Sequence, residues 1–165
     1  MPAAETYLED VRIQFRKLKT LAEEAVAQVT DDELVATLDP ESNSLAVIMK
    51  HVAGNLRSRF TDFLTTDGEK PNRNRDGEFV IAGNPGRAAI MADWESGWLV
   101  LFESLHALHP DDLLKEVRVR GEAVSALAQL NRQMNHHAYH VGQIVFLAKH
   151  LRASEWRNLS IPKKR

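Results

Sequence analysis

The segment Ala123–Leu151, AVSALAQLNRQMNHHAYHVGQIVFLAKHL, decides the fold class of this chain. It contains no proline and a single glycine, and its apolar residues Leu130, Met134 and Val141 recur at helical spacing. An apolar stripe with that period is typical of an amphipathic helix that packs one face against a core. We therefore predict one long helix from about Ala123 to Leu151.

Three further stretches carry the same helical pattern. From Ala3 to Val29 there is no glycine or proline, and apolar residues recur every three or four positions. Another stripe continues to about Leu64, in a helix whose N-terminus is capped by Ser42 or Asn43. The remaining predicted elements are a short helical piece capped at Thr30–Glu33 and a third long helix at Arg87–Leu108.

The connection between the second and third long helices has a different composition. Thr65–Gly86 holds four glycines and two prolines among its charges, which predicts a long irregular loop of the kind that is often functional. Lys115–Gly121 alternates polar and apolar residues, which predicts a short extended segment. The chain has 165 residues and no internal repeat. We therefore expect a single all-α domain over residues 1–165, folded as a four-helix bundle.

Charge and composition argue against several classes of protein. The net charge is only −2, and the basic tail Lys163-Lys164-Arg165 is the sole feature that favours nucleic acid as a partner. No apolar run approaches the roughly 20 residues that span a bilayer, and the N-terminal stretch lacks the hydrophobic core of a signal peptide. The chain has no cysteine, so it forms no disulfide. We expect a cytoplasmic protein without a membrane partner.

Two of the seven histidines lie one helical turn apart, which is a spacing used by metal sites. His136 and His140 are four positions apart, so their imidazoles project from one face of the predicted helix. Zinc proteases use this spacing in their HExxH motif, but here His137 replaces the glutamate, so a protease is rejected. A third ligand has to come from another helix, and His51 in the second long helix is the best candidate.

The other histidines are weaker candidates. His106 and His109 close the third long helix beside a proline and are expected to face water. His150 lies almost three turns beyond His140 and is too distant to share an ion with it. His137 is rotated about 100° from its neighbour around the helix, toward the apolar stripe, so we interpret it as a residue at the edge of the core.

Around these residues the sequence resembles the DinB/YfiT-like superfamily of metal-dependent enzymes, over essentially the whole chain. Members end in a helix with the pattern H-x-x-x-H-x-G-Q, which His136, His140 and Gly142-Gln143 match. They carry a third histidine near the middle of the second long helix, which His51 matches. The resemblance implies an up-down-down-up bundle that holds a divalent metal ion on these three histidines. It also implies a homodimer.

A narrower resemblance is to a branch of this superfamily that has no assigned function. The branch shares the stretch Asp62–Pro71 and continues through Arg73 and Arg75 to Glu78-Phe79. Better understood relatives in the superfamily are transferases that use bacillithiol or mycothiol, and thiol-dependent isomerases. The resemblance therefore implies a class of site without naming a substrate.

Three neutral imidazoles leave coordination positions open, which is the pattern of catalytic rather than structural zinc. Imidazole suits several divalent metals, of which we favour zinc or nickel. The sequence thus predicts a hydrolase, or an S-transferase with a low-molecular-weight thiol as cosubstrate, acting on a small molecule. Two alternatives stay open, namely a bundle that binds a ligand without turnover and one that the ion merely stabilises.

Four polar residues are candidates for contacts around the ion or to the substrate. Gln143 can orient a metal ligand, although a packed helix amide is the simpler interpretation. Asn55 lies one turn beyond the predicted ligand His51 and can reach the same pocket. Arg73 and Arg75 can bind a carboxylate or phosphate on the substrate, and a solvated charged loop is the alternative.

The remaining candidates are two carboxylates and two glycines. Asp62 and Glu78 are of the right type for a general base, but we interpret both as salt-bridge or capping groups. Gly54 and Gly142 each lie within a predicted helix, where glycine costs about 1 kcal/mol relative to alanine. We predict that both glycines allow helices to approach closely near the metal.

Overall fold

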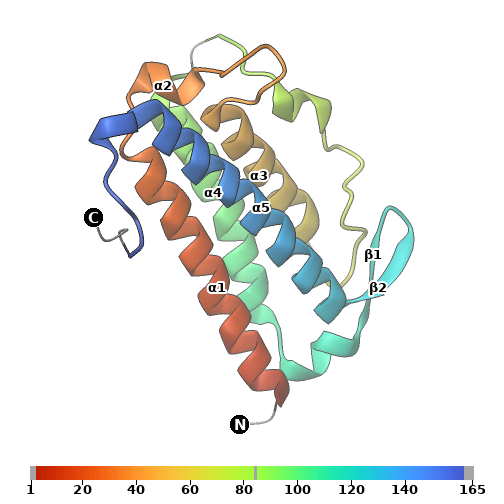
Figure 1. Cartoon of the computed structure of the whole chain (residues 1–165). Helices are drawn as coiled ribbons and strands as arrows, with labels where there is room; N and C mark the ends of the chain where they lie inside the picture. The colour runs from red at the N-terminus through yellow and green to blue at the C-terminus, as the bar shows by residue number, and fades with distance from the viewer. Residues whose placement is uncertain (1–2, 84, 162–165) are drawn as a thin grey trace.

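The computed structural model describes residues 3–83 and 85–161, and most of these are helical (Figure 1). The long helices are α1 (Ala3–Val26), α3 (Leu45–Phe60), α4 (Gly86–Ala107) and α5 (Ala126–Arg152). Shorter elements connect them: α2 (Asp31–Val35), the 3-10 turns η1 (Asp76–Phe79), η2 (Pro110–Leu114) and η3 (Ala153–Glu155), and strands β1 (Glu116–Val119) and β2 (Glu122–Ser125). The predicted helical class is confirmed, with the addition of a small two-stranded sheet.

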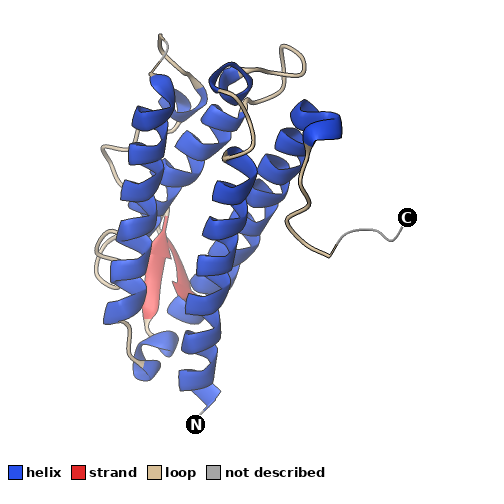
Figure 2. Ribbon diagram, turned by 90° about the vertical axis from the view of Figure 1, so that its left-hand side faces the viewer, coloured by secondary structure: helices blue, strands red, loops and turns tan. Residues whose placement is uncertain are grey.

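The long helices lie side by side around one hydrophobic core. In Figure 1, α1 rises from the N-terminus, α3 and α4 descend, and α5 rises beside α1; Figure 2 shows the same helices from the side. The side chains of Phe15, Trp94 and Trp98 are fully buried in this core. Gly97 brings α4 close to α3, because an added Cβ would lie 2.7 Å from Ala53 Cα. The core thus holds α3 and α5, which carry the candidate histidines, in fixed positions.

Several predicted helix ends are shifted. α1 ends at Val26 rather than Val29. α3 ends at Phe60 rather than Leu64, because Asp62 adopts a φ of 49°, outside the right-handed helical region. The cap of α3 is Ser44, whose side chain accepts from Val47 N, so the prediction of Ser42 or Asn43 was wrong. The capping box at Thr30 and Glu33 is confirmed.

The predicted extended segment is one half of a β-hairpin. β1 and β2 pair antiparallel, and they are joined by Arg120 and Gly121, both at positive φ, as a tight two-residue hairpin turn requires. The carboxylate of Asp67 accepts the backbone N–H groups of these two residues at 2.8 and 2.7 Å, which fixes the hairpin to the long loop. The prediction that the last helix begins at Ala123 was wrong, because residues 122–125 form β2.

The described residues of the predicted loop Thr65–Gly86 are mostly irregular, as expected, and include the 3-10 turn η1. Its backbone is anchored to α3, since Ser58 Oγ donates to Gly68 O at 2.8 Å and Arg59 donates to the same carbonyl. The basic tail Lys163-Lys164-Arg165 lies outside the described residues. Among the helices that the structure describes, none is both long and apolar enough to cross a membrane.

Candidate metal centre

Three histidines from two helices converge between α3 and α5. His51 lies in α3, and His136 and His140 lie one turn apart on α5. One ring nitrogen of each lies within 4.8 Å of the others, and the Nε2 atoms of His136 and His140 are 3.1 Å apart. Tetrahedral zinc–imidazole bonds of about 2.0–2.1 Å separate the ligand nitrogens by about 3.3 Å. The structure therefore brings together the three residues that were predicted as ligands, at a spacing that suits one shared ion.

Hydrogen bonds determine which ring nitrogens of two histidines are protonated. His51 Nδ1 lies 2.9 Å from Glu78 Oε2, and a carboxylate oxygen only accepts, so Nδ1 carries the proton. His140 Nδ1 lies 2.8 Å from the amide oxygen of Gln143, which likewise only accepts. Both rings consequently keep a lone pair on Nε2. The contact predicted for Gln143, which orients a candidate ligand, is present.

The third ring, that of His136, is protonated differently. Its Nδ1 is buried and has no hydrogen-bond partner in residues 3–83 and 85–161. A proton on its Nε2 satisfies the short contact with the Nε2 lone pair of His140. A cation between the rings would take the place of that proton. The donor set is thus three imidazole nitrogens that can all turn lone pairs toward one point, which fits a divalent transition metal.

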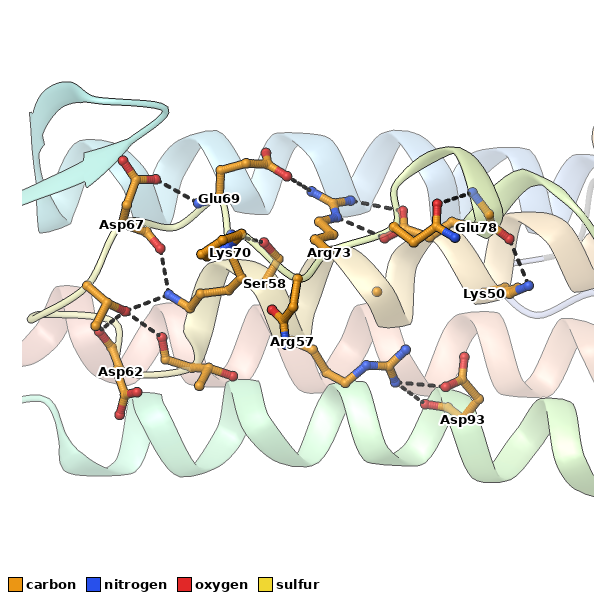
Figure 3. A pocket seen from close by; sticks show the side chains of 17 residues that line it. Lys50, Arg57, Ser58, Asp62, Asp67, Glu69, Lys70, Arg73, Glu78 and Asp93 are labelled. Atoms are coloured by element: carbon orange, nitrogen blue, oxygen red, sulfur yellow. Dashed lines mark hydrogen bonds and ion pairs between the residues drawn. The ribbon is translucent and has the colours of Figure 1, made fainter.

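Glu78 is the buried carboxylate that orients His51. It lies in η1, and Arg73 donates to its oxygens from Nε at 2.8 Å and from Nη2 at 2.9 Å. Figure 3 shows Arg73 between Glu78 and a second carboxylate, Glu69. Burial raises the pKa of Glu78, but the hydrogen bonds from His51 and Arg73 outweigh burial, so the net shift is downward. The carboxyl group is therefore ionised near neutral pH and accepts from His51.

Gly54 leaves room for the side chain of Glu78, because glycine has no Cβ. A Cβ added at Gly54 would lie 2.7 Å from Glu78 Cδ and 3.1 Å from its Cγ. Any larger residue here would displace the carboxylate from His51. The prediction that Gly54 allows a second helix to approach closely was wrong, because its close neighbour is the side chain of Glu78 from the long loop.

Burial keeps His136 and His140 uncharged near neutral pH. Desolvation lowers the pKa of His136 to about 4, with repulsion from His140 and His51 acting in the same direction. Burial also lowers the pKa of His140, although its hydrogen bond with Gln143 opposes the shift. Neutral imidazole is the form that coordinates a metal, so protons compete little with an ion at neutral pH.

The other histidines stand apart from this cluster. His137 is fully buried, with its ring against Phe15 and Trp98 and its Nδ1 2.7 Å from Gln133 O. Burial lowers the pKa of His137 to about 3, so it is a neutral core residue, as interpreted from the sequence. The remaining three, which were expected to face water or to lie too far away, are exposed: His106, His109 and His150.

A hollow of about 270 Å³ opens beside His51 and His136, and we call it the arginine pocket. Its other lining residues are five arginines and two amides, namely Arg59, Arg73, Arg75, Arg120, Arg132, Asn55 and Gln133. Asn55 and Arg75 thus line a hollow that the candidate ligands His51 and His136 also line. Arg73 also reaches the hollow, but its guanidinium is occupied by Glu78 and Glu69.

A larger cleft of about 950 Å³ lies between α3, α4 and the long loop (Figure 3). Four basic and five acidic residues line it. Arg57 contacts Asp93 at 2.8 Å, and Lys50 donates to the backbone carbonyls of Gly77 and Val80 at 2.8 and 2.7 Å. No histidine lines this cleft. These contacts hold the long loop against the helices, and through the loop they hold Glu78.

Residues 2–165 match the family described as Protein of unknown function (DUF1572). The chain belongs to this family. Among curated proteins, none matches the DUF1572 chain. This family has no assigned function, so it supplies no activity.

Some lining residues of this DUF1572 chain were not predicted. Arg132 and Gln133 lie four and three positions before His136, so helical spacing alone could have identified them. Arg59 lies two turns beyond His51 and could have been found in the same way. Arg120 gives no such signal, because it reaches the pocket from the hairpin turn.

The prediction for Gly142 of the DUF1572 chain needs correction. Gly142 was expected to allow a close helix approach near the metal, but a Cβ there would meet nothing within 4 Å, so that prediction was wrong. Asp62 is exposed in the turn after α3 and lines the loop cleft rather than the arginine pocket. Glu78 forms the predicted salt bridge, with Arg73, and in addition orients His51.

Proposed function

We propose that this chain is a metal-dependent enzyme that acts on a small molecule at His51, His136 and His140. The reaction is hydrolysis, or S-transfer with a low-molecular-weight thiol as cosubstrate. The metal is a divalent ion, zinc or nickel. One observation carries the proposal: the three imidazoles converge beside an open pocket, and among residues 3–83 and 85–161 no fourth ligand joins the cluster. Three histidine ligands with open positions are typical of catalytic zinc.

The surrounding residues have definite roles in this proposal. Glu78 accepts from His51 Nδ1, and Gln143 accepts from His140 Nδ1, so the inward lone pairs of both rings are preserved. Arg73 holds Glu78 ionised and in place. When bound, the ion supplies a Lewis acid that makes water or a thiol nucleophilic near neutral pH. The protein therefore needs no cysteine of its own.

The fold belongs to the same proposal. We assign the chain to the DinB-like superfamily, with α1, α3, α4 and α5 forming an up-down-down-up four-helix bundle. The pairing of α1 with α5 and of α3 with α4 supports this assignment. We also assign a cytoplasmic homodimer, and exposed Tyr139 and Phe146 on α5 offer an apolar surface for self-association. Light scattering after size-exclusion chromatography tests the dimer.

The alternatives are a non-catalytic ligand-binding protein and a bundle that the metal only stabilises. A structural metal contributes directly to folding, so chelation would strongly lower the midpoint of thermal unfolding. The core is extensive without any ion, since Phe15, Trp94 and Trp98 are fully buried among hydrophobic neighbours. We therefore expect chelation to abolish turnover and to change stability only modestly.

Turnover assays test the proposal. The protein is loaded with zinc or with nickel and supplied with p-nitrophenyl acetate, or with cysteine and a chlorodinitrobenzene electrophile. Release of nitrophenolate or formation of the thioether is expected with the wild type and with His150→Ala, a control on the same helix, and not with His140→Ala. Equal rates in all three proteins, or none above the background of free metal, would favour the non-catalytic alternatives.

A further inference from the structure

The arginine pocket carries an excess of positive charge at the edge of the histidine cluster. Five arginines line it, and the carboxylates in contact with them are Glu69, Glu78 and the exposed Asp76. The loop cleft offers a contrast, because four basic and five acidic residues line it. Three of the five arginines of the arginine pocket, Arg75, Arg120 and Arg132, are exposed to solvent, and guanidinium groups gathered around one hollow attract an anion to it.

The five arginines fall into two groups. Arg59, Arg73 and Arg120 all contact Glu69, at 3.0, 3.3 and 3.0 Å, and are held in place by it. Arg132 makes no hydrogen bond or ion pair with any residue that the structure describes. Arg75 lies over the ring of Phe79, 5.2 Å from its centroid, and reaches Asp76 only at 3.9 Å. Arg132 and Arg75 are thus the guanidinium groups available to a ligand.

Two buried amides in the same pocket also lack partners. Asn55 and Gln133 are 5% and 7% exposed, and their side-chain oxygens make no hydrogen bond within the described part of the chain. Buried polar side chains are nearly always hydrogen-bonded in folded proteins. Two such exceptions, both lining one small hollow beside a histidine cluster, indicate a ligand that completes their hydrogen bonds.

We propose that the arginine pocket binds an oxyanion group, a carboxylate or a phosphate, of the small molecule on which the histidine site acts. This inference rests on the proposed function and names its substrate class. Arg132 and Arg75 supply charge-assisted hydrogen bonds to the oxyanion, and the amide oxygens of Asn55 and Gln133, which only accept, take a donor group elsewhere on the same molecule. Because His51 and His136 line the same pocket, an anchored substrate has its reacting bond next to the three histidines.

The pocket fits a small anion rather than a polymer. A hollow of about 270 Å³ is slightly smaller than most small-molecule sites, which span about 300 to 1,000 Å³, and it has room for one charged group and a short chain. Arginine forms paired hydrogen bonds with carboxylate and with phosphate alike. The arginines of the pocket therefore indicate an oxyanion but do not distinguish a carboxylate from a phosphate.

Isothermal titration with inorganic phosphate, acetate and neutral acetamide tests the pocket on the protein as purified. Phosphate or acetate is expected to saturate at one site per chain, and acetamide is not expected to bind. The anion that binds more tightly shows whether the substrate carries a phosphate or a carboxylate. Arg132→Gln should weaken binding about 10-fold, and Arg132→Lys should weaken it less. The control is Arg16→Gln, on α1, which removes the same charge from an exposed residue away from the pocket.

The control and the metal content separate the outcomes. Equal weakening in Arg132→Gln and Arg16→Gln, or no saturable binding of either anion, would overturn the inference. Far-UV circular dichroism checks that each variant is folded, and metal content is measured on the same samples. Anion binding that depends on Arg132 in a protein without metal would support the pocket while contradicting the proposed function. Bound metal without anion binding would contradict the pocket and leave the proposed metal site intact.

Discussion

Gly54 and Gly142 provide a matched pair of substitutions, because both lie inside helices and only one has a close neighbour. In Gly54→Ala the new Cβ would lie 2.7 Å from Glu78 Cδ, so the carboxylate has to move. Glu78 is buried and bonded to both His51 and Arg73, and a shift therefore breaks these hydrogen bonds. In Gly142→Ala the added methyl group meets no atom within 4 Å.

The two variants should differ in both metal affinity and stability. Loss of a hydrogen-bond partner behind a ligating histidine weakens metal binding about 10- to 100-fold, which we expect for Gly54→Ala. Replacing glycine by alanine at position 54 stabilises α3 by about 1 kcal/mol. The lost charge-assisted hydrogen bond costs about 1.5–3 kcal/mol, so the net free energy of unfolding falls by about 0.5–2 kcal/mol. Gly142→Ala should keep the metal affinity of the wild type, and its free energy of unfolding should rise by about 1 kcal/mol.

Two assays measure these effects. Zinc affinity is determined by competition with a chromogenic chelator, and the free energy of unfolding is determined by urea denaturation of the same samples. Unchanged zinc affinity in Gly54→Ala would refute the role assigned to Glu78. Weakened affinity in Gly142→Ala would show that α5 is in close contact with a neighbour that the structure does not place there.

Three further predictions follow from other contacts. Gln143→Leu removes the acceptor for His140 Nδ1 and should weaken zinc affinity about 10-fold in the same competition assay, and unchanged affinity would count against its role. Gly97→Ala should cost about 1–3 kcal/mol in urea denaturation, because its Cβ would lie 2.7 Å from Ala53 Cα and neither backbone can yield easily; a stabilised variant would contradict this. The pKa of His137 is about 3 in the folded chain and about 6.5 when unfolded, so the unfolded state binds the extra proton as pH falls from 6.5 toward 3. Stability of the chelator-treated protein should therefore decrease over that range, by about 1.4 kcal/mol per pH unit for this residue, and His137→Gln should flatten the slope; an identical slope in both proteins would refute it.

The helices and the candidate ligands could be predicted because both depend on local periodicity. Apolar spacing identified the long helices, and the separation of His136 and His140 by one turn placed their rings on one face. His51 could be selected only as the histidine inside another long helix. The same reasoning, extended by one turn before His136, would also have identified Arg132.

The parts that were missed depend on contacts distant in sequence. Residues 123–125 were assigned to the last helix, but Val124 pairs with Val117 across a hairpin whose turn needs two residues at positive φ. Pairing of that kind overrides local preference. Glu78 lies in a loop without periodicity, and its distance from His51 is set by Arg73 and by the loop contacts with α3. The sequence therefore identified Glu78 as a carboxylate in the loop but could not identify His51 as its partner.

The metal content of the purified protein tests the central claim most directly. Plasma mass spectrometry is applied to the wild type, to His51→Ala, His136→Ala and His140→Ala, and to His150→Ala as the exposed control on α5. We predict about one zinc or nickel ion per chain in the wild type and the control, and none in the three variants. Absence of metal from the wild type after reconstitution with both ions, or its retention in the three variants, would contradict the proposed site.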